Sequence, residues 1–387
     1  MISKPYKKHT SLVRPVSGNF GRNEWAILGA PCINIKLLAH DVISALSPKY
    51  KCAYSDSSHN DEVVAPPGRL AGGAVLEYTD QINYHQFNYT GLKPMAFKQQ
   101  FADMDMVLVN GNHQPAMAQV VIIYNNKSAS LQKRIKQLTN VQLILFADYV
   151  YDVFDFIKEA VPNWEQIPTY RLNETDKIIA FFEDKMEQAK PVLNGLVLAG
   201  GQSVRMGYDK STVNWHGKEQ RYYMADVLKE YCHDVFISCR TDQKQHIDPA
   251  YKTLADTFTE LGPFGAILSA FRENPNSAWL VVACDMPLLN AEVLQYLLAN
   301  RNTSSLATAY ENAVDGFPEP LITIWEPKSY PVLLAFLAQG YSCPRKVLIN
   351  SDTNLLKATD ASTLTNVNTP EDLQRIQNEL REKIITG

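Results

Sequence analysis

The chain has 387 residues, of which 45% are hydrophobic and 20% are charged, as expected of a globular protein long enough for two domains. A formal net charge of −4 argues against a broad nucleic-acid-binding surface, which would be basic. Apolar runs stay shorter than the ~18–20 residues that cross a bilayer. The first twenty residues carry cations without an apolar stretch behind them, so we expect neither a membrane segment nor a signal peptide.

Cysteine usage points to a reducing compartment. The sequence has six cysteines in no CxxC spacing and beside no suitably spaced histidine, which argues against structural zinc. Scattered thiols of this kind fit the cytoplasm. The six are Cys32, Cys52, Cys232, Cys239, Cys284 and Cys343.

In the first half, short β-branched runs alternate with helical patterns, which predicts a mostly parallel sheet covered by helices. Strands are expected at 24–31, 106–111, 118–125 and 141–148. A segment rich in Gly, Pro, Tyr and Asn, 61–92, is interpreted as irregular. A helix over 33–46 would place five apolar side chains near one face: Ile33, Leu37, Leu38, Ile43 and Leu46.

A helix followed by proline marks the predicted domain boundary. The stretch "NETDKIIAFFEDKMEQAKP" has a helical apolar stripe, a candidate N-cap at Asn173 or Thr175, and a stop before Pro191. We therefore predict two α/β domains, 1–190 and 191–387, each with three α/β/α layers.

The second half repeats the alternation of strands and helices. Strands are expected at 192–201, 234–240 and 278–285, and the last is apolar on successive residues, as in a central parallel strand. The chain ends in a predicted helix over 369–384, with Thr369 as N-cap and Pro370 at the first helical position.

The loop "LAGGQSVRMGYDK", residues 198–210, follows the first of these strands. Two glycines allow close backbone approach, and successive backbone N–H groups in such a loop can bind an anion. Arg205 and Lys210 add two cations suited to phosphate oxygens. The loop matches neither a Walker A motif nor a GxGxxG fingerprint, so we interpret it as a different kind of phosphate-binding loop.

Two aspartates also follow predicted strands. Asp285 in "VVACDMPLL" stands where a magnesium ligand could sit beside substrate phosphates, although an aspartate N-cap of the next helix is an equally good explanation. Asp256 in "LADTFTELGPFGAI" precedes a Gly-Pro turn, and alone it would be taken as loop punctuation. Because ligands in open parallel sheets bind outside the carboxyl ends of strands, the three motifs together predict one site.

The second half resembles the molybdenum cofactor guanylyltransferases, within the Rossmann-like nucleotidyltransferases of GT-A-like fold. The resemblance rests on the glycine loop, the Asp256 and Asp285 motifs, "EPLITIW" and "NVNTPEDL", in family order from about residue 193 to 385. It implies transfer of GMP from GTP to molybdopterin with release of pyrophosphate. Molybdoenzyme apoproteins are then candidate recipients of the product, with no nucleic-acid or membrane partner.

The resemblance also implies roles for residues. Arg205, Lys210 and Asp285 would be catalytic, Asp285 would hold Mg²⁺, and Asn368 would lie where relatives often complete the metal or substrate site. The nucleotide would be bound by Leu198, Ala199, Gly200, Gly201, Lys210, Asp256 and Asp285.

One departure leaves alternatives open. Relatives often carry an asparagine after the strand at 234–240, near the nucleotide sugar, whereas this chain has Cys239 and Arg240. A cytidylyltransferase or a sugar-phosphate nucleotidyltransferase of the same superfamily therefore remains an alternative to the guanylyltransferase. A carrier that only binds nucleotide or cofactor is a third reading, which the set Arg205, Lys210 and Asp285 disfavours.

The first half has the outline of a P-loop domain whose site has lapsed. In "WAILGAPCINIK" the second glycine of a Walker A motif would fall on Asn34 and its lysine on Ile35, with Lys36 one residue late. "MDMVLVNGNHQPA" resembles a strand of the small GTP-binding protein that accompanies the guanylyltransferase, with Asn110 in place of its acidic residue. Two buried strands of an unrelated α/β domain are the alternative.

Overall fold

The computed structural model describes residues 20–58, 66, 68–200, 210–313, 315–367, 369 and 371–378. The chain divides into two units, Met1–Ala189 and Lys190–Gly387, each described here by itself. Among the described residues, none of the helices combines the length and the apolar composition that a bilayer-spanning segment requires.

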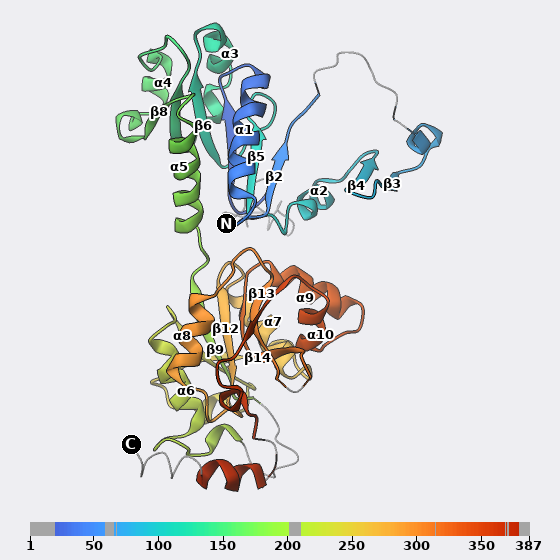
Figure 1. Ribbon diagram of the computed structural model, residues 1–387, viewed down its shortest axis with the longest axis vertical. Helices are drawn as coiled ribbons and strands as arrows, with labels where there is room; N and C mark the ends of the chain where they lie inside the picture. The colour runs from blue at the N-terminus through green and yellow to red at the C-terminus, as the bar shows by residue number, and fades with distance from the viewer. Residues whose placement is uncertain are drawn as a thin grey trace, which may run out of the picture. The chain divides into compact units, whose positions relative to one another are not determined.

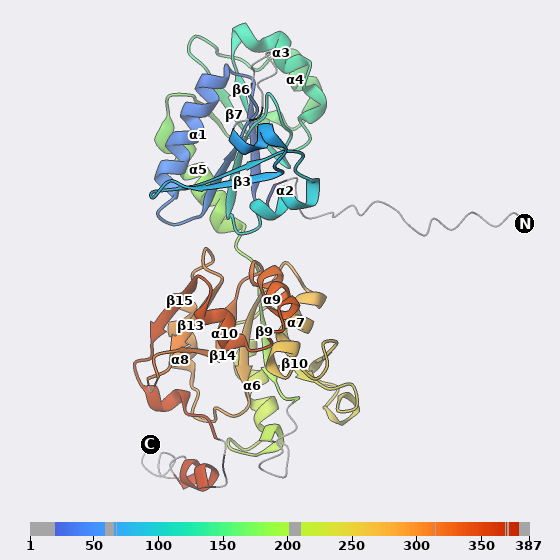
Figure 2. The ribbon, with the colours of Figure 1, turned by 90° about the vertical axis from the view of Figure 1, so that its right-hand side faces the viewer.

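The first unit is built on a parallel sheet with the order β2-β5-β1-β6-β7-β8. Helices α1 and α5 pack on one face of this sheet, and α2, α3 and α4 lie on the other (Figures 1 and 2). The strands are β1 (Glu24–Leu28), β2 (Cys52–Ser55), β5 (Met106–Asn110), β6 (Ala118–Ile123), β7 (Val141–Phe146) and β8 (Thr169–Arg171). The helices are α1 (Cys32–Leu46), α2 (Pro94–Gln100), α3 (Ser128–Gln132), α4 (Asp155–Ala160) and α5 (Thr175–Gln188). The predicted α/β/α layering of this half is confirmed.

Helix α1 buries only part of the predicted face, since Leu38 and Leu46 are in the core as expected but Ile33 and Leu37 are not. Ile33 and Leu37 are 63% and 56% exposed, so the prediction that they face the core is wrong. The helix carries apolar residues on more than one side, and only one stripe can face the sheet. The side chains that pack into the core are Ile35, Leu38, Ala39, Val42 and Leu46.

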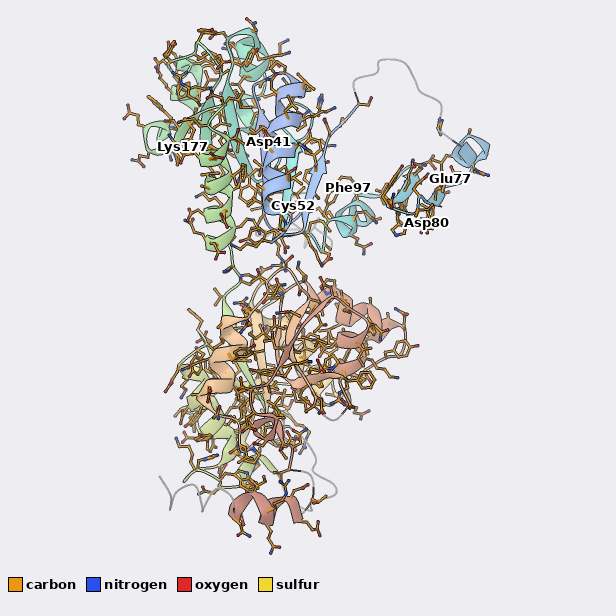
Figure 3. The ribbon with its side chains drawn as sticks, in the orientation of Figure 1. Asp41, Cys52, Glu77, Asp80, Phe97 and Lys177 are labelled. Atoms are coloured by element: carbon orange, nitrogen blue, oxygen red, sulfur yellow. The ribbon has the colours of Figure 1, made fainter. Side chains whose placement is uncertain are left out.

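The prediction that the segment 61–92 is irregular is wrong for part of it. Strands β3 (Leu76–Asp80) and β4 (His85–Tyr89) form a hairpin there. Tyr78 pairs with Phe87 across the hairpin, and their ring centroids are 4.9 Å apart. Figure 3 shows Glu77 and Asp80 on this hairpin, set apart from Asp41 of α1.

The second unit holds a sheet with the order β11-β10-β9-β12-β14-β13-β15, in which β14 runs antiparallel to both of its neighbours. Helices α6 and α8 cover one face, and α7, α9 and α10 cover the other. The strands are β9 (Leu193–Leu198), β10 (Val235–Cys239), β11 (Lys252–Ala255), β12 (Ala278–Ala283), β13 (Ala307–Glu311), β14 (Pro318–Trp325) and β15 (Thr353–Lys357). The helices are α6 (Gln220–Lys229), α7 (Pro263–Glu273), α8 (Ala291–Ala299), α9 (Ser329–Ala338) and α10 (Pro344–Ile349). The three layers predicted for this half are confirmed, and every residue of β12 is buried, as a central strand requires.

Candidate active site

Four neighbouring strands of the second unit end at one edge of its sheet. In the parallel block β11-β10-β9-β12, Leu198 pairs with Ser238 of β10 and with Ala283 of β12. Cys239 of β10 in turn pairs with Ala255, the last residue of β11. The loops that follow these strands therefore leave the sheet at the same edge, where ligands bind in open parallel sheets.

The glycine turn begins directly after β9. The Ala199 N–H donates to the Ser238 carbonyl at 3.1 Å, which ties the start of the turn to β10. A methyl group added at Gly200 would lie 3.5 Å from Asp256 Oδ2, so the turn passes close to this carboxylate. Leu198, Ala199 and Gly200 thus lie together with Asp256, as the predicted site requires.

The rest of the predicted loop lies mostly outside the described residues. Gly201 and Arg205 belong to this undescribed stretch. Lys210 begins the short 3-10 helix η5 (Lys210–Thr212), but its side chain is not described. The roles of these three residues stay predictions.

Asp256 is held by a serine that the sequence did not single out. Ser238 is 1% exposed, and its Oγ donates to Asp256 Oδ1 at 2.7 Å. Burial raises the pKa of the Asp256 carboxyl, and the bond from Ser238 opposes this rise. A serine one residue before the end of an apolar strand was the available signal, since a hydroxyl buried there needs a partner.

Asp285 does not cap the following helix. Helix α8 begins six residues later, and its N-cap is Asn290, whose Oδ1 accepts from the Val293 N–H at 3.0 Å. The half-buried Asp285 instead stands just beyond the end of β12, at the edge shared with the glycine turn. The capping explanation is therefore wrong for this residue, and a role at the site gains weight.

The C-terminal segment returns to the same edge. The Val367 N–H donates to the Asp285 carbonyl at 2.8 Å, and Val367 is buried in a small cluster with Leu288 and Ile376. The predicted N-cap is confirmed, since Thr369 Oγ1 accepts from the Asp372 N–H at 3.2 Å. Asn368 lies outside the described residues, although its neighbour Val367 contacts Asp285.

The segment around His216 also contacts the loop that carries Asp285. His216 Nε2 is 2.9 Å from the Pro287 carbonyl, and its ring stacks on Tyr223 at a centroid distance of 4.0 Å. Gly217 follows with a φ of +84°, so His216 lies in a tight turn. His216 is therefore part of the turn and also contacts the loop that carries Asp285.

Asp256 and Asp285 leave the sheet from strands that are not neighbours. Asp256 and Asp285 follow strands separated by two others, which corresponds to about 14 Å across the sheet at ~4.8 Å per strand. Among the described residues, no group of three His, Cys, Asp or Glu side chains has the arrangement of a metal site. Any further ligand to a metal at Asp285 would therefore come from substrate oxygens or from residues outside the described part of the chain.

The position of the expected asparagine is occupied by one buried residue and one half-buried residue. Cys239 is 1% exposed, and burial raises its pKa to about 11. Arg240 reaches solvent, where its guanidinium contacts Asp242 at 3.1 Å. Of the two, Arg240 is the residue able to contact a nucleotide sugar.

The first unit has a glycine turn directly after β1, at the position where the sequence predicts a lapsed P-loop. Gly29 has a φ of +96°, and its N–H donates to Asn112 Oδ1 at 3.3 Å, where a phosphate-binding loop would offer this group to a ligand. Ile35, at the position of the lysine, is fully buried. The exposed Lys36 lies 3.5 Å from Asp56.

The comparisons with known proteins agree with this geometry. Residues 195–354 match the MobA-like NTP transferase domain. A probable molybdenum cofactor guanylyltransferase of Nostoc sp. is 32% identical over 195 residues, which cover 48% of this chain and 91% of that protein. The molybdenum cofactor guanylyltransferase of Pseudomonas putida is 30% identical over 193 residues, 49% of this chain and all of the other.

A longer relative, the molybdenum cofactor biosynthesis bifunctional protein of Synechocystis sp., is 36% identical over 201 residues. The match covers 52% of this chain and 58% of the length of that protein.

The glycine turn and the strand-end carboxylates, on a Rossmann-like sheet that matches a transferase domain, define a nucleotidyltransferase. The Nostoc relative is covered almost to its full length at an identity above 30%. The chain belongs to the molybdenum cofactor guanylyltransferase family.

Proposed function

We propose that the chain transfers GMP from GTP to the terminal phosphate of molybdopterin and releases pyrophosphate. The observation that supports this most is the meeting of the Gly200 turn, Asp256 and Asp285 at one sheet edge, in a chain whose relatives carry the guanylyltransferase name. CTP remains the competing nucleotide, because Arg240 stands where relatives often have asparagine.

Mg²⁺ fits the residues present. This ion is usually held by one or two carboxylates together with substrate phosphates, and Asp285 offers one half-buried carboxylate beside the glycine turn. When bound, the ion would supply positive charge to the phosphates. Asp256 follows β11, which is three positions from β12 in the sheet. Its carboxylate would contact the nucleotide, and Asp285 would bind the ion.

The remaining chemistry needs charge and alignment more than proton transfer. The phosphate of molybdopterin would attack the α-phosphorus of GTP, so that a new P–O bond forms as the bond to pyrophosphate breaks. A phosphate monoester is already anionic at neutral pH, so no general base is required. Arg205 and Lys210 would offset the charge of the phosphates, and the turn at Gly200 would fix the nucleotide in line.

The test is pyrophosphate release with each of the four nucleoside triphosphates, with and without molybdopterin. We expect release with GTP that depends on molybdopterin, and a loss of at least ~100-fold in Asp285→Asn. Asp234→Asn is a matched control, because Asp234 precedes β10 at the opposite edge of the sheet. Release with CTP alone would reassign the nucleotide, and full activity of Asp285→Asn would refute the site.

We also propose that the first unit is a degenerate relative of the small GTP-binding protein of the same pathway. The Gly29 turn supports the relationship, and Ile35 and Asn110 in place of a lysine and an acidic residue argue against hydrolysis. In the full chain carrying Asp285→Asn, we expect no release of phosphate from GTP, with or without Lys36→Ala. Phosphate release that disappears with Lys36→Ala would contradict this proposal.

A further inference from the structure

A cluster of polar side chains in the first unit has no part in the proposed transfer of GMP. Cys32 is the first residue of α1, and its Sγ is 3.4 Å from His113 Nε2. The same nitrogen is 3.8 Å from Asp56 Oδ1. A thiol, an imidazole and a carboxylate thus meet at the carboxyl ends of β2 and β5, the edge of a parallel sheet at which ligands bind.

The surroundings of Cys32 favour a thiolate. Helix α1 has fifteen residues with no acidic residue in its first turn, so its N-terminal partial charge acts on the sulfur undiminished. Burial would raise the pKa of the Cys32 thiol, but neighbouring polar side chains, Asn110 first and then His113 and Asn112, lower it by more. The net pKa lies below the ordinary thiol value, while the side chain stays half-buried and open to small molecules.

A buried amide also faces this cluster. Asn110 is fully buried, and its Oδ1 accepts from the Asn112 N–H at 3.1 Å. Its Nδ2 lies near Cys32 and Asp56 but has no partner of hydrogen-bond geometry among the described residues. A donor buried in this way costs free energy unless an acceptor arrives, which a group bound at Cys32 would supply.

The cluster differs from the other thiols of the chain. All six cysteines lie in the described part of the chain and none is in a disulfide. Burial raises the pKa of Cys52, labelled in Figure 3, to about 11 and that of Cys232 to about 12. Cys343 is exposed and is the natural comparison for reactivity. Because no three-residue metal arrangement occurs among the described residues, the cluster is better suited to sulfur chemistry than to a metal.

We propose that Cys32 is a nucleophilic thiol that reacts with soft electrophiles, in particular the sulfur of low-molecular-weight disulfides. The Cys32 thiolate attacks one sulfur of the disulfide, a new S–S bond to Cys32 forms, and the old S–S bond breaks. The leaving thiolate takes a proton from solvent, so no further oxidant is needed. His113 positions the Cys32 thiolate through the contact of its Nε2 with Sγ. The Nδ2 group of Asn110 donates a hydrogen bond to an acceptor atom of the bound group.

The test uses the full chain, with glutathione disulfide as probe and with iodoacetamide in parallel. Peptide mass spectrometry measures the rate of modification at each cysteine between pH 5.5 and 8.5. We expect Cys32 to react severalfold faster than Cys343 at pH 6.5, because the polar side chains around it lower the pKa of its thiol. His113→Gln should slow Cys32 at that pH and leave Cys343 unchanged.

Two further variants keep the result interpretable. Cys343→Ser removes the comparison thiol and should leave the rate at Cys32 unchanged. Asn112→Ala removes an amide donor 3.7 Å from Cys32 Sγ but keeps His113, so it should slow Cys32 less than His113→Gln does; a slowing as large or larger would overturn the role of His113. Equal rates at Cys32 and Cys343 across the pH range would overturn the proposal as a whole.

Discussion

Replacing Ser238 by alanine should change the ionisation of Asp256. The serine Oγ donates to the carboxylate at 2.7 Å from a site that is 1% exposed, so water cannot readily replace it. A hydrogen bond to a charged group contributes ~1.5–3 kcal/mol, and 1.36 kcal/mol corresponds to one pKa unit. Ser238→Ala should therefore raise the pKa of Asp256 beyond the rise that burial already causes, because the carboxylate loses a hydrogen bond of that strength.

The effect on stability follows the same sign. A carboxyl whose pKa is raised on folding lowers the free energy of unfolding as the pH rises from its unfolded to its folded pKa. Below the ordinary pKa of aspartate, the free energy of unfolding of the variant should thus be close to that of the wild type. Above that pH, it should become increasingly lower than that of the wild type. Carboxyl ¹³C titration of Asp256 and urea unfolding at several pH values measure the two effects.

Ser329→Ala is the control for this experiment. Ser329 is fully buried in the same unit, and its Oγ donates to the Leu306 carbonyl at 2.7 Å, so the variant also loses a buried hydrogen bond. We expect it to lose stability equally at all pH values and to leave Asp256 unchanged. An unchanged Asp256 titration in Ser238→Ala, or an equal shift in both variants, would refute the reasoning.

Two further variants test the packing of the second unit. Glu326 is 1% exposed and accepts two hydrogen bonds from the Arg301 guanidinium, at 2.7 and 2.9 Å. Arg301→Ala leaves this carboxylate buried without its cation, so we expect the free energy of unfolding in urea to fall by ~3–5 kcal/mol. A smaller loss in Arg301→Lys would support the charge as the cause. Asn290→Ala removes the cap of α8 and should cost about 1 kcal/mol in urea unfolding, while the rate of pyrophosphate release stays near that of the wild type. A large drop in that rate would show that the cap and Asp285 are coupled.

Much of the second unit could be predicted because its signals are local. An apolar run that ends in a glycine turn or an aspartate predicts both a buried strand and the edge where it stops, so Gly200, Asp256 and Asp285 were found from the sequence. Ser238 was missed since its importance depends on a partner eighteen residues away, across a strand pair. The contact of His216 with Pro287 was likewise not predicted, because it spans 71 residues.

The first unit shows where periodicity fails. Helix α1 has apolar residues on two sides, and the pattern alone chose the side of Ile33 and Leu37. Only the position of the sheet decides which stripe is buried. The hairpin of β3 and β4 was hidden because Gly and Pro residues flank it and Asn residues lie within it, although Tyr78 and Phe87 face one another across it. The start of α5 at Thr175 with Glu174 as N-cap likewise differs by one residue from the predicted caps, a normal error for helix ends.

The bond between Asp285 and Val367 has a consequence for the order of folding during synthesis. About eighty residues separate the two, and at 5–20 residues per second a ribosome needs roughly 4 to 16 seconds to make them. During that interval β9, β10, β11 and β12 can already pair, yet the loop of Asp285 has no segment over it. The catalytic edge is thus the last part of this domain to be finished on the ribosome, and a nascent chain stalled before Val367 would hold a sheet without a completed site.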